Sequence, residues 1–228
     1  MSAAPLSPNH GARRDGARPE LVVIHYTGMA DAAAARARLC DPAAEVSAHW
    51  LIAEDGTTEA LVPEAARAWH AGAGSWQGRG DVNSRSIGIE LANPGDRPFP
   101  EPQMLALEAL LRAILARWAL GPEAVIGHSD MAPERKIDPG PRFDWRRLAR
   151  QGLAVWPEAA PTRVSDAATF LALAQSFGYP ETRLAVLLPA FRSRFRPGHD
   201  GPLDATDLGL VADLAARFGA DGDQWRAS

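Results

Sequence analysis

Four short apolar runs among the first 130 residues restrict this chain to a fold built around a β-sheet. They fit buried strands and lie at 21–24, 46–53, 87–91 and 125–126. The residues EDGT at 54–57 predict a hairpin, so that 58–62 returns antiparallel to the second run. Helical patterns are found at 31–39, 102–120 and 145–152. Because strands and helices alternate irregularly around a hairpin, we expect an α/β (α+β) fold with a mixed central β-sheet flanked by helices.

The sequence pattern changes after residue 152. Residues 155–163 carry Pro157 and Pro161 and are typical of a linker. Three short amphipathic helices are expected beyond it, near 166–177, 181–195 and 205–218. The 228 residues therefore divide into four expected parts. These are a flexible polar leader at 1–19, a main domain at 20–152, a linker at 153–163 and a small three-helix domain at 164–220.

The composition excludes several classes of function. A net charge of −4 argues against general polyanion binding, so we expect no nucleic-acid partner. The single cysteine, Cys40, rules out an internal disulfide and a cysteine-based zinc cluster. No apolar stretch predicts a transmembrane segment, and residues 1–19 have neither an apolar core nor a lipobox cysteine. We expect a cytoplasmic protein, with the periplasm or cell envelope as the alternative. The oligomeric state is not indicated.

Three candidate metal ligands stand at strand ends or just beyond one. His25 ends the first strand, His128 ends the last, and Asp138 follows after a further ten residues. Strand ends of one sheet can bring such distant residues to a single edge. Two imidazoles and one carboxylate would leave an open fourth position on zinc, as a catalytic site requires. Each residue alone is weak evidence for a metal site, because a histidine at a strand end is more often a structural residue with its hydrogen bonds satisfied.

Glu90 and Lys136 are candidates for the accompanying acid–base and charge chemistry. Glu90 interrupts an apolar strand, where a carboxylate is costly unless it is paired or faces a cleft. It would serve there as a general base, unless it points outward from an exposed edge. Lys136 is the only lysine among 24 cationic residues, which suggests a position where guanidinium will not serve. It would stabilise an oxyanion, and the alternative is composition drift that spared one surface lysine.

Four stretches together resemble a known family of hydrolases. LVVIHYTG, VSAHWLIAEDG, RAWHAGAGSWQGRGDVNSRSIGIELANPG and VIGHSDMAPERKIDPGP are similar to the zinc-dependent N-acetylmuramoyl-L-alanine amidases of the amidase-2 type. That family also contains phage lysozyme-type amidases and peptidoglycan recognition proteins. The resemblance runs from about residue 20 to 152 and is greatest to the AmiD-like branch, in which a small C-terminal domain follows. RFRPGHDGPLDA resembles the turn of a peptidoglycan-binding three-helix module, although Phe191-Arg192 departs from its usual phenylalanine and glutamine.

The resemblance implies a role for each candidate catalytic residue. His25, His128 and Asp138 would bind one zinc ion per chain, Glu90 would be the base, and Lys136 would stabilise charge. Residues 20–152 would then be a zinc amidase domain, and 164–220 a peptidoglycan-binding-like module.

Further residues fall where the family lines its substrate groove. The resemblance places Trp69, His70 and Asn83 there, although Trp69 also fits a core aromatic and Asn83 a turn residue. Arg142, just past the proline turn, would meet a peptide carboxylate or else face solvent. His49 is expected to be structural or to support a ligand rather than to bind metal.

The expected function is zinc-dependent hydrolysis of the amide between N-acetylmuramic acid and L-alanine of the stem peptide, in cell-wall recycling or turnover. The sequence leaves open whether the sugar is the 1,6-anhydro form. The partners would be peptidoglycan fragments or polymer. The alternative is a non-catalytic protein that recognises peptidoglycan or muropeptides.

Overall fold

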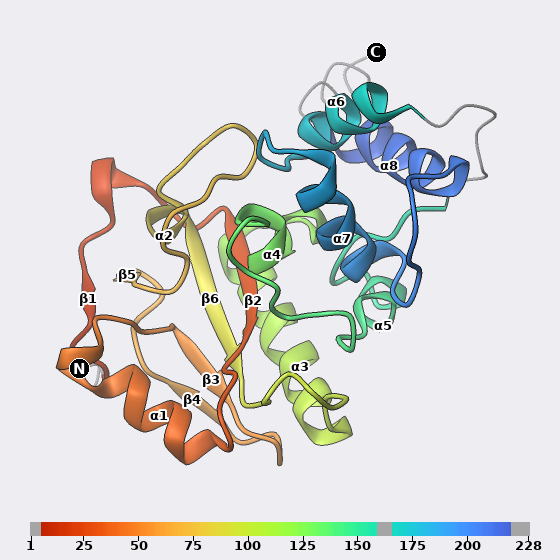
Figure 1. Cartoon of the computed structure of the whole chain (residues 1–228). Coiled ribbons are helices and arrows are strands. Elements are labelled where there is room, and N and C mark those ends of the chain that lie inside the picture. Colours follow the sequence, from red (N-terminus) through yellow and green to blue (C-terminus); the bar gives the residue numbers. More distant parts are fainter. Residues whose placement is uncertain (1–5, 159–165, 220–228) are drawn as a thin grey trace.

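A mixed five-stranded sheet runs through the centre of the computed structural model, which describes residues 6–158 and 166–219. The strand order is β4–β3–β6–β2–β7 (Figure 1). The strands are β2 (Leu21–Tyr26), β3 (Trp50–Ile52), β4 (Thr58–Ala60), β6 (Ser86–Leu91) and β7 (Val125–Gly127). β2 pairs in parallel with both β6 and β7, and β3 pairs in parallel with β6. The hairpin partner β4 runs antiparallel to β3, so the expected mixed sheet is confirmed.

β3 is shorter than the run expected at 46–53. The amide of Gly88 in β6 donates to Nδ1 of the buried His49 at 2.9 Å. The amide of Ser47 bonds outside the sheet, to the carbonyl of Trp69. The backbone of His49 still pairs, because its amide donates to the carbonyl of Gly88 at 3.0 Å. The amide of Gly88 is bonded to a side chain and cannot extend the backbone ladder toward residue 46, so β3 itself begins at Trp50.

The two faces of the sheet have different coverings because successive side chains of a strand alternate between them. One face packs against α3 (Glu101–Trp118) and α5 (Trp145–Arg150). Its buried side chains include Val22, Ile24, Ile87 and Ile89. The opposite face carries His25 and Glu90, which are register partners on neighbouring strands. It is covered in part by α1 (Ala32–Cys40), through Leu39 and Leu51.

The flexible leader expected at 1–19 is wrong for residues 6–19. β1 (His10–Gly11) pairs antiparallel with β5 (Arg67–Ala68). The guanidinium of Arg13 donates to three backbone carbonyls at 2.7–3.0 Å, those of Glu64, Ser84 and Ser86. These bonds fasten the segment to backbone carbonyls of the main domain. Residues 1–5 lie outside the described part of the chain.

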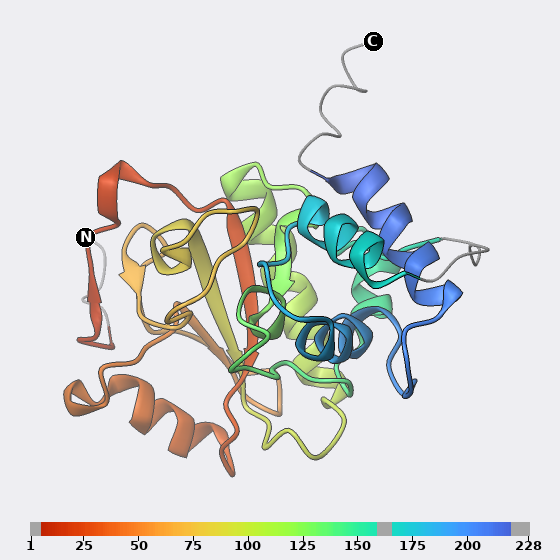
Figure 2. The ribbon, with the colours of Figure 1, turned by 45° about the horizontal axis from the view of Figure 1, so that its top comes forward.

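Three helices follow near the expected positions. They are α6 (Ala167–Phe177), α7 (Leu184–Phe195) and α8 (Ala205–Phe218), and they lie at the end of the molecule away from α1 (Figure 1, Figure 2). Of the stretch expected as a linker, 153–155 is buried, and 159–163 lies outside the described residues. Within the described ranges, no helix combines the length and apolarity needed to cross a membrane.

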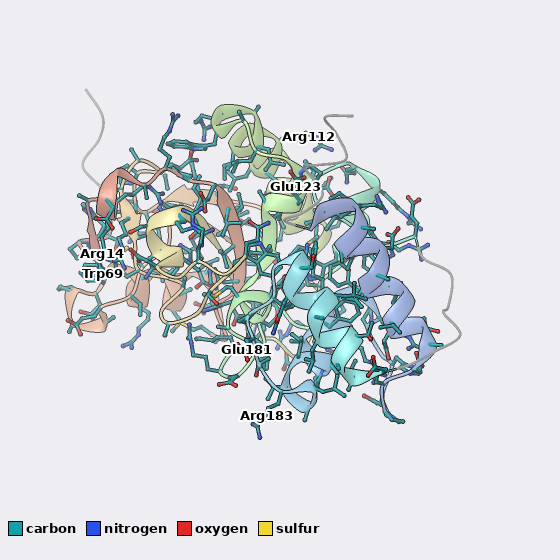
Figure 3. All side chains as sticks on the ribbon, turned by 90° about the horizontal axis from the view of Figure 1, so that it is seen from above. Arg14, Trp69, Arg112, Glu123, Glu181 and Arg183 are labelled. Atoms are coloured by element: carbon teal, nitrogen blue, oxygen red, sulfur yellow. The ribbon has the colours of Figure 1, made fainter. Side chains whose placement is uncertain are left out.

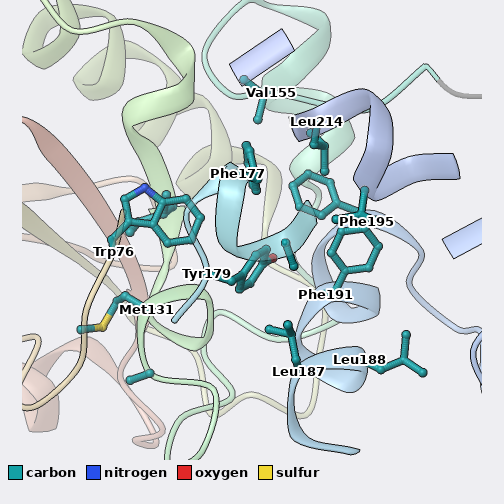
Figure 4. Close-up of a cluster of buried hydrophobic side chains, with 14 of the residues drawn as sticks. Trp76, Met131, Val155, Phe177, Tyr179, Leu187, Leu188, Phe191, Phe195 and Leu214 are labelled. Carbon is teal, nitrogen blue, oxygen red and sulfur yellow. The ribbon is translucent and has the colours of Figure 1, made fainter. Parts of the chain in front are cut away.

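The C-terminal helices and the sheet share one hydrophobic cluster. Trp76, from the loop before α2 (Val82–Arg85), lies edge-on to Phe177 at 5.5 Å and to Tyr179 at 5.3 Å between ring centroids (Figure 4). A Cβ on Gly178 would come within 2.6 Å of the indole, so only glycine permits this approach. Val23 of β2 belongs to the same cluster. The helices therefore have no core of their own that is separate from the sheet.

We predict that Trp76→Ala lowers the free energy of unfolding by about 3–5 kcal/mol, because it opens a cavity in this shared cluster. Urea denaturation followed by fluorescence and far-UV circular dichroism should give one coincident transition in wild type and variant alike. Two separate transitions in the wild type would contradict the shared core.

Candidate active site

His25, His128 and Asp138 converge at the carboxyl edge of the parallel strands. His25 is the fifth residue of β2, and His128 begins α4 (His128–Met131) directly after β7. Nδ1 of His25 lies 2.9 Å from Nδ1 of His128 and 2.9 Å from Oδ2 of Asp138. The remaining distance, from His128 Nδ1 to Asp138 Oδ2, is 3.1 Å. All three side chains are buried, and they form a candidate metal site.

The protonation states of these groups suit a cation. Burial, followed by the neighbouring His128, lowers the pKa of His25 to about 4, so its imidazole is neutral at pH 7. Burial alone would raise the pKa of Asp138, but hydrogen bonds with His128 and His25 hold it below its usual range. Neutral imidazole and carboxylate are the forms that bind metals. Two nitrogens and one oxygen, with no fourth ligand among residues 6–158 and 166–219, match a site that keeps a position open for reactants.

A chain of hydrogen bonds determines which nitrogen of His25 carries the proton. The Ser86 hydroxyl donates to the carbonyl of Val82 at 2.5 Å, so its oxygen accepts from Nε2 of His70 at 3.1 Å. Nδ1 of His70 then accepts from Nε2 of His25 at 3.0 Å. Burial holds the pKa of His70 well below its ordinary value, so its ring has only one proton to give. His25 is therefore left with an unprotonated Nδ1 facing His128 and Asp138.

His128 is oriented in the same way by a backbone group. Its Nε2 donates to the carbonyl of Ala71 at 2.9 Å, which leaves Nδ1 free of its proton. Asn83 holds this loop, because its Oδ1 accepts from the amides of His70 at 3.0 Å and Ala71 at 2.8 Å. The sequence resemblance implies substrate contact for His70 and Asn83. In the structure the polar atoms of both residues support the two histidines, while His70 also lines the pocket, so substrate contact stays a prediction.

Gly88 is a residue of the site that sequence reasoning missed. It lies in the middle of β6 under the ring of His70, and a Cβ there would come within 2.5 Å of that ring. Any larger residue would displace His70 from His25. The signal was present in the sequence, since a glycine inside an apolar strand indicates close approach of another group.

Glu90 stands beside His25 on the same face of the sheet, not on an exposed edge. Its Oε2 is buried and has no hydrogen-bond partner among the described residues. Burial, with a contribution from the charge of Asp138, raises the pKa of Glu90 to about 8, while Lys136 opposes the shift. An unpartnered carboxyl group with its pKa near neutrality is typical of a group that exchanges protons with a ligand.

These groups share one pocket of about 420 Å³. It is lined by His25, His70, Glu90, His128, Lys136 and Asp138, together with residues that sequence reasoning did not single out, among them Tyr26, Thr27, Met29, Arg38 and Val46. Trp69 also lines it, partly exposed on the side of the molecule away from α6–α8 (Figure 3). Arg142 is exposed and does not line this pocket, so the structure does not bring it into the site. His49 is buried behind it, as expected of a structural residue.

Comparisons with known proteins agree with this geometry. A model of the family described as N-acetylmuramoyl-L-alanine amidase matches residues 15–141. The chain is 37% identical to N-acetylmuramoyl-L-alanine amidase AmiD of Escherichia coli K12, over 90% of this chain and 85% of that protein. The structure of E. coli AmiD in complex with anhydro-N-acetylmuramic acid-L-Ala-D-gamma-Glu-L-Lys is similar with a TM-score of 0.82 and 33% identity, covering 97% of this chain and 94% of the other.

A second solved structure is similar over the same extent. It is AmpDh3 of Pseudomonas aeruginosa in complex with anhydromuramic pentapeptide, with a TM-score of 0.82 and 31% identity, covering 96% of this chain and all of the other. The likeness to both structures extends through α6–α8, beyond the residues that the family model matches. With its family match over more than half its length and a curated relative over nine-tenths of it, this chain belongs to the N-acetylmuramoyl-L-alanine amidases.

Proposed function

We propose that this chain hydrolyses the amide between 1,6-anhydro-N-acetylmuramic acid and L-alanine of the stem peptide, using one zinc ion held by His25, His128 and Asp138. The observation that carries the proposal is the convergence of these three ligand atoms beside the unpartnered Oε2 of Glu90, within one pocket. The anhydro form is supported by the anhydro-muropeptides bound in the two similar structures.

The proposed mechanism divides the work between Glu90 and Lys136. When bound, zinc supplies Lewis acidity for the scissile carbonyl and for water. Glu90 takes a proton from the attacking water and returns it to the departing amine of L-alanine. It must be a carboxylate to begin, and the positive charge of Lys136 favours that form. Lys136 also faces the pocket without an ion-pair partner among the described residues, so its ammonium is free to stabilise the oxyanion.

The first prediction concerns the metal. Purified protein should contain one zinc ion per chain, and prolonged dialysis against a chelator should abolish activity, which stoichiometric zinc restores. Mass spectrometry of an anhydro-muropeptide digest would show release of a peptide with a free N-terminal L-alanine. Full activity in protein shown to be metal-free would overturn the zinc proposal. An intact muropeptide after incubation with zinc-loaded protein would favour recognition without cleavage.

The second prediction tests Glu90. Glu90→Gln should keep its zinc and its fold but lose about 10²–10⁴-fold in kcat, since the amide cannot exchange the proton. Metal analysis and steady-state kinetics check both parts. Glu59→Gln is the matched control, because Glu59 lies in β4 and pairs with Arg36 outside the pocket. Near-native turnover in Glu90→Gln would remove Glu90 from the base role.

The third prediction separates two roles of His70. If His70 orients His25, His70→Phe should weaken zinc binding by about 10–100-fold. If it contacts substrate instead, KM should rise while zinc affinity stays at the wild-type value. Competition titration with a zinc-binding dye, alongside KM measured at saturating zinc, distinguishes the two.

Cell-wall binding by α6–α8 is a separate proposal, which rests on the resemblance of RFRPGHDGPLDA to a peptidoglycan-binding module. In the turn that resembles a peptidoglycan-binding module, Asp204 caps α8 and accepts from Arg196, and His199 lies 3.2 Å from Asp204. These contacts give the motif a structural role, which is to cap the N-terminus of α8. Sedimentation of the Glu90→Gln protein with insoluble peptidoglycan measures binding without digestion.

A further inference from the structure

A buried ion pair joins the C-terminal helices to the turn that carries His128. Arg194 of α7 donates to Oδ2 of Asp130 at 2.5 Å and to the carbonyl of Val125 at 2.9 Å. Its guanidinium also lies 4.3 Å from the ring centroid of Trp145. The hydroxyl of Tyr179 donates to the other oxygen, Oδ1, of Asp130 at 2.8 Å. Asp130 and Arg194 are 1% and 2% exposed, so neither charge has water as an alternative partner.

Asp130 belongs to the backbone that presents the candidate ligands. Its Oδ2 accepts from the amide of Gly127 at 2.7 Å, which closes the turn from β7 into α4 around His128. The amide of Ser129, the residue after His128, donates to the carbonyl of Asp138 at 2.9 Å. One short turn thus connects the backbone of two of the three converging residues. Its shape depends on where the Asp130 carboxylate is held.

We propose that Arg194 and Tyr179 are positioning residues for the metal site, acting through Asp130 on the turn that carries His128. The inference rests on the proposed zinc site. It gives α6–α8 a role that differs from cell-wall binding, since Arg194 of α7 and Tyr179, between α6 and α7, bind Asp130 in the turn that carries His128. The charge of Arg194 keeps the Asp130 carboxylate in place, and the Tyr179 hydroxyl fixes its rotation.

The same helix offers a matched control. Arg192 is also buried, at 5% exposure, and pairs with the buried Asp207 through Nε at 3.1 Å. It also donates to the carbonyls of Gly201 and Pro202 at 2.6 and 2.7 Å. Loss of Arg192 therefore removes a buried ion pair of the same kind, but one that serves the loop before α8 and not α4.

The test measures zinc affinity and ligand geometry in the full chain. Metal-free wild type, Arg194→Met, Tyr179→Phe and Arg192→Met would be titrated with zinc against a competing dye. The visible spectrum of each cobalt-loaded protein would report ligand geometry, and thermal denaturation without metal would report stability. We expect Arg194→Met to weaken zinc binding about tenfold and to alter the cobalt spectrum. Tyr179→Phe should have the same effects in smaller measure, whereas Arg192→Met should lower stability alone.

The outcomes distinguish failure of the positioning role from failure of the proposed zinc site. Wild type that binds no zinc would overturn both. Zinc-binding wild type with unchanged affinity and spectrum in both Arg194→Met and Tyr179→Phe would overturn the positioning role alone. An equal loss of affinity in Arg192→Met would show a general effect of stability. If Arg194→Met fails to fold, Tyr179→Phe decides, because it removes a single hydrogen bond and leaves the ion pair in place.

Discussion

The parallel pairing of β2 between β6 and β7 is the constraint on which the rest of this structure depends. Parallel strands end at a common edge, so residues far apart in the chain meet where those strands stop. His25 and Glu90 are register partners, and β7 ends at Gly127, one residue before His128. The candidate base Glu90 and two of the three candidate ligands are thus placed by backbone hydrogen bonds before any side-chain contact is considered. Such placement on a rigid element gives the site its precision.

Burial then determines what these groups can do. Desolvation keeps the imidazole of His25 neutral and moves the pKa of Glu90 toward neutrality. The same low polarity makes an unpaired donor expensive, and each ring nitrogen of His25, His70 and His128 has a specific partner. The resulting hydrogen bonds assign the proton positions of His25 and His128, the two candidate histidine ligands. They require His70 to lie directly on β6, which is why that strand carries a glycine at position 88.

The C-terminal helices belong to the same structure as the sheet. Their aromatic side chains complete a cluster that includes Trp76 and Val23, and the pair Arg194–Asp130 extends from α7 to the β7–α4 turn. A buried charge pair contributes little net stability, because the attraction between the two charges only offsets the free energy lost when they are removed from water. What it does provide is geometry, since few arrangements satisfy both charges. In the proposed positioning role, the pair holds the turn that carries His128.

The sequence by itself determined the mixed sheet and most of its strands and helices. It also determined the five candidate residues that line the pocket, which are His25, Glu90, His128, Lys136 and Asp138. These features are local, because apolar periodicity sets the strands and the candidate ligands follow strand ends. Only the tertiary structure decided the hydrogen-bond partners of His70 and Asn83, the absence of Arg142 from the pocket, and the order of residues 6–19. The division of the chain into domains and its cytoplasmic location stay predictions. The sequence could not supply the features that the tertiary structure decided, because they depend on hydrogen bonds between residues far apart in the chain. His70 bonds to His25, 45 residues away in sequence, and Arg194 bonds to Asp130, 64 residues away. Such partners depend on how the sheet and helices pack, which no local pattern specifies.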